Sequence, residues 1–210
     1  MGGKSKAVIA ALVLTISAGL AYYLYVAKQK KTQRENVIAL LGDTTKHLRA
    51  ALSGQPAPEL VTRIDANLKL ARAPHYPELA NAAEHYIHGA REIARKRADA
   101  ERLGREAALS RRALTMHMSV ASQRDGYWIR VASDLKKRVE RDHHDLEVSL
   151  KALSHLLYTL PESQKDLAPH VGTSVLLEDG ERRKARDRAE EAAKRASDEL
   201  EKIRRLALPR

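Results

Sequence analysis

The chain has 210 residues, a formal net charge of +11 and no cysteine, which excludes disulfide bridges, thiolate zinc sites and cysteine nucleophiles. Phenylalanine is absent and aromatic residues make up only 4% of the chain, whereas 31% of the residues are charged. Thick globular cores draw much of their buried area from aromatic side chains, so this composition predicts an all-α protein whose long helices pack along narrow seams.

An apolar stretch near the start of the chain has the length of a transmembrane helix. Residues 1–6 form a short basic tail, and residues 7–27 then carry no charge over 21 positions. At about 1.5 Å per residue, a helix of this length spans about 30 Å, which is the thickness of the hydrocarbon core of a bilayer. Tyr22, Tyr23 and Tyr25 lie near its end, where aromatic side chains favour the headgroup level. The stretch therefore predicts an N-terminal transmembrane anchor.

A cleaved signal peptide is the alternative to an anchor. Lys4 and Lys6 would form its basic start, and Gly-Leu-Ala at 19–21 fits a small-x-small cleavage site. The apolar run continues beyond this point to residue 27, which makes it longer than the apolar region of a signal peptide. We therefore favour a retained single-pass anchor.

Small side chains recur at every fourth position of this stretch and share one face of the expected helix. They are Ala7, Ala11, Thr15 and Gly19. Faces of this kind let two transmembrane helices approach closely. Self-association through this face is therefore one hypothesis, and a surface that meets only lipid is the other.

Basic residues flank the apolar stretch on both sides, and the cluster that follows it is Lys28, Lys30, Lys31 and Arg34. We expect these four side chains to contact anionic lipid headgroups, an attraction of about 1 kcal/mol per basic residue. Slightly more basic residues follow the stretch than precede it. The positive-inside rule therefore favours a cytoplasmic body over a periplasmic or otherwise extracytoplasmic one.

Residues 28–55 predict a juxtamembrane helix that continues directly from the anchor. Its apolar and small residues step 3-4-3-4 along one face, at Ile38, Leu41, Thr45, Leu48 and Leu52. Gly54 is placed to end this helix, and two prolines follow it.

Residues 56–160 predict a helical bundle with long heptad helices. After a short helix that ends at Pro74, a seam of mostly apolar and small residues recurs in steps of four and three from Leu79 to Val139, with Arg97, Arg111 and Asp125 as its charged positions. An Asp-Gly turn dipeptide allows a hairpin at 124–126, which would fold this stretch into two packed helices. The unbroken seam instead fits one continuous rod. We favour the hairpin, because a rod would need partner chains to cover its seam.

The last part of the chain changes character at Pro161, where we expect the Leu-rich helix to end. Residues 161–180 predict an irregular connector, because further prolines and glycines interrupt them. Residues 181–207 predict a C-terminal charged helix. Its narrow seam consists of Ala185, Ala189, Ala192, Ala196, Leu200 and Ile203.

One cluster of acids and histidines has the spacing of a metal site. Glu140 and His143 form a Glu-x-x-His step, which di-iron helical bundles use, and Glu84 and His88 lie one turn apart on another helix. A di-iron site needs two such steps and two further glutamates, whereas this chain offers a single step. The four residues are therefore weak candidates, and we expect no metal and no cofactor.

The chain lacks the usual catalytic and phosphate-binding motifs, including glycine-rich phosphate loops, the dinucleotide fingerprint, His-Glu-x-x-His and the nucleophile elbow. We therefore expect no enzymatic activity. Basic residues between 91 and 112 alternate with acids and lack aromatic neighbours, which argues against nucleic-acid binding. Trp128, the only tryptophan, is either a core anchor at the tip of the hairpin or a partner contact.

These observations together predict a membrane-anchored helical scaffold or tether that acts by protein–protein interaction. Homo-oligomers would form through the heptad seam and the small-residue face of the anchor, while the sequence does not specify another protein partner. One alternative is an envelope-spanning periplasmic rod, which is similar to the spanins of phage lysis in architecture alone. The other is a metal-binding helical bundle.

Overall fold

The computed structural model describes residues 3–55, 57–71, 73–120 and 126–206, and their side chains except those of 3–15, 57 and 173. These residues form five α-helices, one short 3-10 helix and no strand, so the prediction of an all-α helical bundle is confirmed. The elements are α1 (Gly3–Leu52), α2 (Ala57–Leu70), α3 (Pro77–Ser119), α4 (Gly126–Lys165), η1 (Thr173–Val175) and α5 (Asp179–Arg205).

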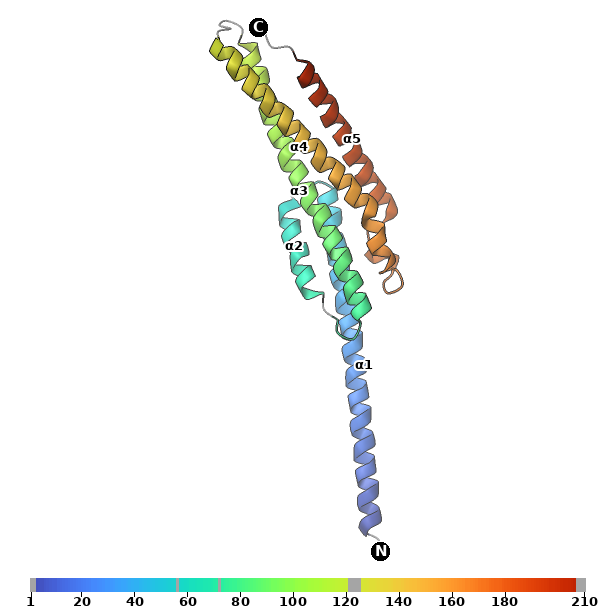
Figure 1. Ribbon diagram of the computed structural model, residues 1–210. Coiled ribbons are helices and arrows are strands. Elements are labelled where there is room, and N and C mark those ends of the chain that lie inside the picture. The colour runs from blue at the N-terminus through green and yellow to red at the C-terminus, as the bar shows by residue number, and fades with distance from the viewer. Residues whose placement is uncertain (1–2, 56, 72, 121–125, 207–210) are drawn as a thin grey trace.

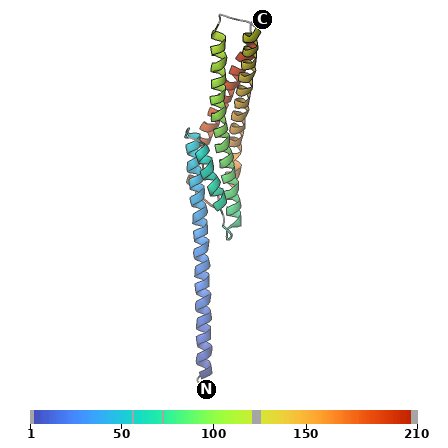
Figure 2. The same ribbon diagram turned by 90° about the vertical axis from the view of Figure 1, so that its left-hand side faces the viewer.

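The helices form an elongated body from which the first half of α1 projects alone (Figures 1 and 2). α3 and α4 lie side by side and run in opposite directions, α5 lies along α4, and α2 covers α1 and α3. The stretch 77–160 is therefore divided between two helices and is not one rod. The expected turn at 124–126 falls largely on residues 121–125, which lie outside the described residues.

Gly54 shows why α1 ends where it does. Its φ angle of 99° is in the left-handed region, which glycine adopts without a steric penalty. The amides of Gly54 and Gln55 donate to the carbonyls of Ala51 and Ala50, over 3.3 and 3.1 Å. This is the pairing of a Schellman motif, which satisfies the last carbonyls of a helix while the chain reverses direction.

The main hydrophobic core lies where α1, α2, α3, the C-terminal part of α4 and the α4–α5 connector meet. Its most deeply buried large side chains are Leu41, Leu48, Ile64, Leu79, Tyr86, Ile87, Ile93, Leu157 and Leu167. Only the second half of α1 contributes, beginning at Val37. A single helix thus continues from the projecting segment into the centre of the body.

α3 buries two faces in its first half and one in its second half. The expected seam is buried at Leu79, Ala83, Tyr86, Ala90 and Ile93. Ala82, Ile87 and Ala94 are buried as well, because α1 and α2 pack against that second face. Farther along α3, the buried residues are fewer and mostly small: Ala100, Ala107, Ser110 and Leu114.

Two small clusters hold α3, α4 and α5 together beyond the end of α1. One joins Ala100, Leu150 and Ala193, and the other joins Leu114, Val139 and Ile203. Arg111, a charged member of the expected seam, pairs with Glu199 of α5 over 2.9 Å. This half of the body therefore relies on two small apolar clusters and a cross-helix ion pair.

α4 does not end at Pro161, as the sequence suggested, but continues to Lys165. Proline has no amide hydrogen, so it cannot donate the helical bond to the carbonyl of Leu157 four residues earlier. The Nη1 atom of Arg182 donates to that carbonyl over 3.2 Å, and its Nη2 atom pairs with Asp179 over 3.0 Å. Arg182 is only 8% exposed. The buried guanidinium thus replaces the hydrogen bond that the proline removes.

Substitution of Arg182 by methionine is expected to lower the free energy of unfolding by about 1.5–3 kcal/mol, the range for a lost hydrogen bond to a charged group. In a Pro161→Ala background the loss should be smaller, because the alanine amide at that position can donate to the carbonyl of Leu157 instead. Urea denaturation of the full-length protein in micelles, followed by circular dichroism, measures both. Equal losses in the two backgrounds would show that the two residues are not coupled.

Candidate membrane-facing helix and binding surfaces

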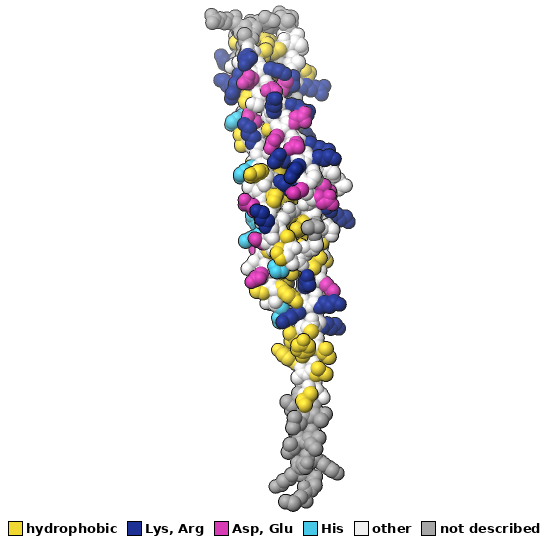
Figure 3. Space-filling model, turned by 90° about the vertical axis from the view of Figure 1, so that its right-hand side faces the viewer, with side chains coloured by type: hydrophobic (Ala, Val, Ile, Leu, Met, Phe, Trp, Pro, Cys, Tyr) yellow, Lys and Arg dark blue, Asp and Glu magenta, His cyan; other side chains and the backbone are white. Residues whose placement is uncertain are grey.

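The projecting part of α1 carries a row of large apolar side chains that nothing else in the described chain covers. Its exposed members are Ile16, Leu20, Tyr22, Tyr23, Leu24 and Tyr25, each between 58% and 71% exposed. In Figure 3 they form the hydrophobic patch below the body. The surface of the body itself is a mixture of basic and acidic side chains. Soluble monomers rarely expose contiguous apolar patches of this kind without a partner or a membrane.

The predicted span 7–27 extends beyond the part of the chain whose side chains are described. The side chains of Ala7, Ala11 and Thr15 lie outside the described residues. At Gly19, the fourth member of the small-residue face, an added Cβ would meet nothing within 4 Å. A side chain at that position would therefore meet no other helix in the described part of the chain.

A search of the described residues finds no helix with a stretch long and apolar enough to cross a membrane.

The basic cluster after the apolar row is divided between solvent and body. Lys28, Lys30 and Lys31 are exposed, and Lys31 lies 3.9 Å from Glu35. Arg34 is also exposed, but its Nη2 atom donates to the carbonyl of His170 in the α4–α5 connector over 3.1 Å. Three of the four side chains expected to contact lipid therefore point into solvent, and the fourth, Arg34, joins α1 to the body by a hydrogen bond.

A short bare segment of α1 separates the apolar row from the core. From Tyr25 to Gln33, the first residue of this segment that is hydrogen-bonded to the body, the helix rises by about 12 Å at 1.5 Å per residue. Near the upper end, the Oε1 atom of Gln33 accepts a hydrogen bond from the backbone amide of His75 over 3.1 Å. The body thus stands away from the apolar row on a single helix.

The structure does not bring the four candidate metal ligands together. His143 lines a groove with Gly104 of α3, whereas Gly89, beside His88, lies against Leu160 of α4. Between His88 and Gly104, α3 rises by about 24 Å. The pair on α3 and the pair on α4 are therefore several helical turns apart.

Each of the four candidate ligands lies in a different environment. Glu84 and His88 are exposed, and Glu140 lies 3.9 Å from Lys136. His143 is buried, and its Nδ1 atom is bonded to the carbonyl of Val139 over 3.0 Å. Within the described part of the chain, no group of three or more acids and histidines could hold a metal ion.

His143 instead faces a cross-helix charge cluster. Glu199 of α5 receives a hydrogen bond from Lys202 and lies close to Arg111 and His143. The bond from Lys202, followed by the nearby positive charges, lowers the pKa of Glu199 below its ordinary value, although burial opposes this shift. The cluster therefore keeps Glu199 ionised and ties α5 to α3.

Trp128 lies against α3 at the far end of the hairpin and is only 6% exposed. Its ring stacks on that of His117, with centroids 4.9 Å apart and planes inclined by 20°. The Nε2 atom of His117 is also bonded to the backbone carbonyl of Trp128 over 3.0 Å. The indole thus closes the bundle end, and Tyr127 beside it is 74% exposed.

A polar centre that the sequence did not reveal joins α1 to the rest of the body. Thr45 Oγ1 and the hydroxyl of Tyr86 are joined by a hydrogen bond of 2.8 Å, and the amide of Leu177 donates to the same hydroxyl over 3.3 Å. Tyr86 is fully buried, and burial raises the pKa of its hydroxyl above the ordinary value, despite these bonds. The hydroxyl therefore links α1, α3 and the α4–α5 connector.

Further polar contacts surround α1 on its other sides. Asn67 of α2 donates to Asp43 over 2.9 Å and to Thr44 over 3.1 Å. Arg49 pairs with Glu181 of α5 over 2.8 Å and donates to the carbonyl of Leu176 over 3.2 Å. The second half of α1 is thus fixed both by apolar packing and by directional bonds to the other helices.

Comparison with known proteins finds no matching family model, no similar curated protein and no similar solved structure.

Proposed function

We propose that the protein is a single-pass, membrane-anchored helical scaffold or tether without catalytic activity. The observation that carries this proposal is the exposed apolar row on α1, which continues without a break into the helix at the centre of the body. In the sequence, the row is part of the uncharged stretch 7–27, which is long enough to span a bilayer. Insertion of this stretch would cover the row.

The charges on α1 support the same proposal. Lys28, Lys30 and Lys31 follow the tyrosines directly and reach solvent, where anionic headgroups would meet them. The excess of basic residues after the stretch favours a cytoplasmic body, and the small-residue face with Gly19 would allow two anchors to associate. In this arrangement the body begins about 12 Å from the headgroups, at Gln33, and offers its outer helices to partners.

The folded-back arrangement of α3 and α4 weighs against the envelope-rod alternative. A rod that crosses an envelope needs one helix through this region, whereas the two helices pack together and shorten the molecule. The separation of the paired acids and histidines likewise weighs against the metal-binding alternative.

Two charges placed in the apolar row test the anchor. Because Ile16 and Leu20 are exposed, replacing both with arginine removes no packing from the body. Each arginine is expected to oppose insertion by about 2.5–3.5 kcal/mol if it lies near the centre of the bilayer. The wild-type protein should stay in the membrane pellet through a high-pH wash, and the Ile16→Arg/Leu20→Arg variant should move to the soluble fraction.

A matched control places arginine at Leu109 and Val148, which are exposed apolar residues of the body. This control should remain in the membrane pellet. Recovery of the unchanged chain in the soluble fraction, or retention of the Ile16→Arg/Leu20→Arg variant in the membrane, would contradict the proposed anchor. Protease protection of the body in intact cells, lost when the membrane is opened, would place the body on the cytoplasmic side.

A further inference from the structure

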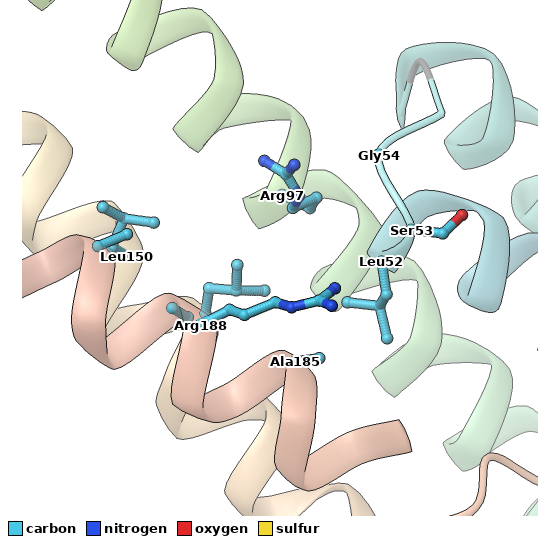
Figure 4. Close-up of a pocket in the computed structure, with 10 residues that line it drawn as sticks. Leu52, Ser53, Gly54, Arg97, Leu150, Ala185 and Arg188 are labelled. Atoms are coloured by element: carbon cyan, nitrogen blue, oxygen red, sulfur yellow. The ribbon is translucent and has the colours of Figure 1, made fainter. Parts of the chain in front are cut away.

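A cleft of about 240 Å³ lies at the end of α1, between α3, α4 and α5 (Figure 4). Leucine and alanine side chains form its apolar lining: Leu52, Leu150, Leu153, Ala185, Ala189 and Ala192. Ser53, Gly54, Arg97 and Arg188 complete the lining. The cleft thus combines an apolar wall with two guanidinium groups.

The cleft follows from the way α1 ends. The Schellman turn at Gly54 takes the chain away from the bundle, whereas α3, α4 and α5 continue past this level. The volume that another turn of α1 would fill is left free, and the three alanines that α5 contributes to its wall are too small to fill it. Its position is therefore a property of the fold and not of a mobile loop.

The positive charge at the cleft is only partly neutralised. Arg97 pairs with Glu101 over 3.1 Å, but Arg188 has no hydrogen bond or ion pair with any residue that the structure describes. Figure 4 shows Arg188 reaching from α5 across the opening towards Leu52, with Arg97 on the opposite wall. The guanidinium of Arg188 is thus available to a bound anion.

Arg188 is not needed to cap α1. The carbonyls of Arg49, Ala50 and Ala51 already accept bonds from the amides of Ser53, Gln55 and Gly54. An adjoining cleft of about 180 Å³ shares Arg188 and adds Lys184, while its one acid, Glu181, is held by Arg49. The described surroundings therefore offer several cations and no free carboxylate.

We propose that this cleft binds a small amphiphile that has one anionic headgroup and a short apolar chain. The chain would lie on the leucine and alanine wall, and the carboxylate or phosphate would pair with Arg188. At the roughly 30 Å³ that one water molecule occupies in the liquid, the cleft holds about eight non-hydrogen atoms, which is the size of hexanoate.

The ligand would come from solution and not from a bilayer. Leu52 lies about 40 Å along α1 from Tyr25, because the helix between them is continuous. A lipid whose headgroup stays at the level of the tyrosines cannot reach the cleft. The exclusion of bilayer lipids rests on the proposed anchor, whereas binding at the cleft itself does not depend on the scaffold function or on the side of the membrane that the body occupies.

Titration calorimetry on the full-length chain in phosphatidylcholine nanodiscs tests the proposal, with hexanoate and hexyl phosphate as probes and empty nanodiscs as the blank. Saturable binding of one probe molecule per chain is expected. Arg188→Ala should weaken it about tenfold, the effect of losing one charge-assisted bond. Ala185→Leu, which narrows the cleft and keeps every charge, should weaken it as well.

Arg183→Ala is the matched control, because Arg183 is an exposed arginine of α5 that lines neither cleft. It should bind both probes as the unchanged chain does. Absence of saturable binding, equal loss in Arg183→Ala, or equal binding of the neutral probe 1-hexanol would overturn the proposal. Inorganic phosphate that binds as tightly as hexyl phosphate would also overturn it, because the apolar wall would then play no part.

Discussion

Replacing Tyr86 with alanine is expected to lower the free energy of unfolding by about 3–5 kcal/mol. Tyr86 is fully buried between α1, α3 and the α4–α5 connector, so its removal leaves a cavity in the main core. The substitution also deprives Thr45 and the amide of Leu177 of the hydroxyl that joins them. Urea denaturation of the full-length protein in micelles measures the change.

Tyr86→Phe separates the hydroxyl from the ring and should lower the free energy of unfolding by about 1–3 kcal/mol. Burial raises the pKa of the hydroxyl above 10.0, so the unfolded chain ionises first. The stability that Tyr86 contributes is thus full below pH 10 and is lost as the pH rises through the folded-state pKa. Tyr86→Phe should make this alkaline loss less steep.

Tyr158→Ala serves as the control, because Tyr158 is 64% exposed on α4. It should change the free energy of unfolding by no more than about 0.5 kcal/mol. If Tyr86→Ala is no more destabilising than Tyr158→Ala, the hydroxyl and ring of Tyr86 do not hold α1 in the body.

Substituting Trp128 by alanine is expected to lower the free energy of unfolding by about 3 kcal/mol. The indole is buried at the end of the hairpin and stacks on His117, so its loss leaves α3 and α4 poorly packed there. Thermal melts followed by circular dichroism measure the effect. Loss of protection from hydrogen exchange should be greatest near the ends of both helices.

Tyr127→Ala is the matched control for Trp128, because Tyr127 is adjacent and 74% exposed. We expect it to melt as the unchanged chain does. An unchanged melt for Trp128→Ala, together with a loss of self-association in crosslinking of the full-length protein, would instead make Trp128 a partner contact.

The seam of α3 could be predicted because the residues that contact the neighbouring helix recur at a regular spacing in the sequence. Leu79, Ala83 and Tyr86 recur at heptad spacing, and the structure buries all three. Ile87 and Ala94 lie outside that spacing and are buried only because α1 and α2 pack on a second face. The seven-residue spacing of Ile87 and Ala94 marks a second face, but the sequence of α3 alone does not say which helices cover it.

Arg182 shows a second limit of sequence patterns. It is one of several arginines near the start of α5, and its neighbour Arg183 is exposed. Its burial depends on Pro161 of the preceding helix, which leaves the carbonyl of Leu157 without its helical donor. A proline normally indicates the end of a helix, so the sequence pointed away from this contact.

The candidate surfaces likewise differ in how far the sequence predicts them. The apolar row on α1 could be predicted from composition, because a long uncharged run is visible in one stretch of sequence. The cleft at Gly54 could not, because Arg97, Leu150 and Arg188 come from three helices that meet only in the folded chain. The separation of His88 from His143 likewise depends on the register of α3 against α4.

The continuity of α1 has a mechanical consequence. A force applied at the projecting end acts along the axis of a helix whose other half lies lengthwise between α2 and α3. Such a pull loads the core contacts of Leu41, Leu48 and Thr45 in shear, all at once, and does not peel them apart one after another. The same geometry transmits any twist of the projecting end directly to the body, because no turn or flexible joint lies between Tyr25 and Leu52. α1 therefore acts as a rigid helix that is attached to the body through its core contacts.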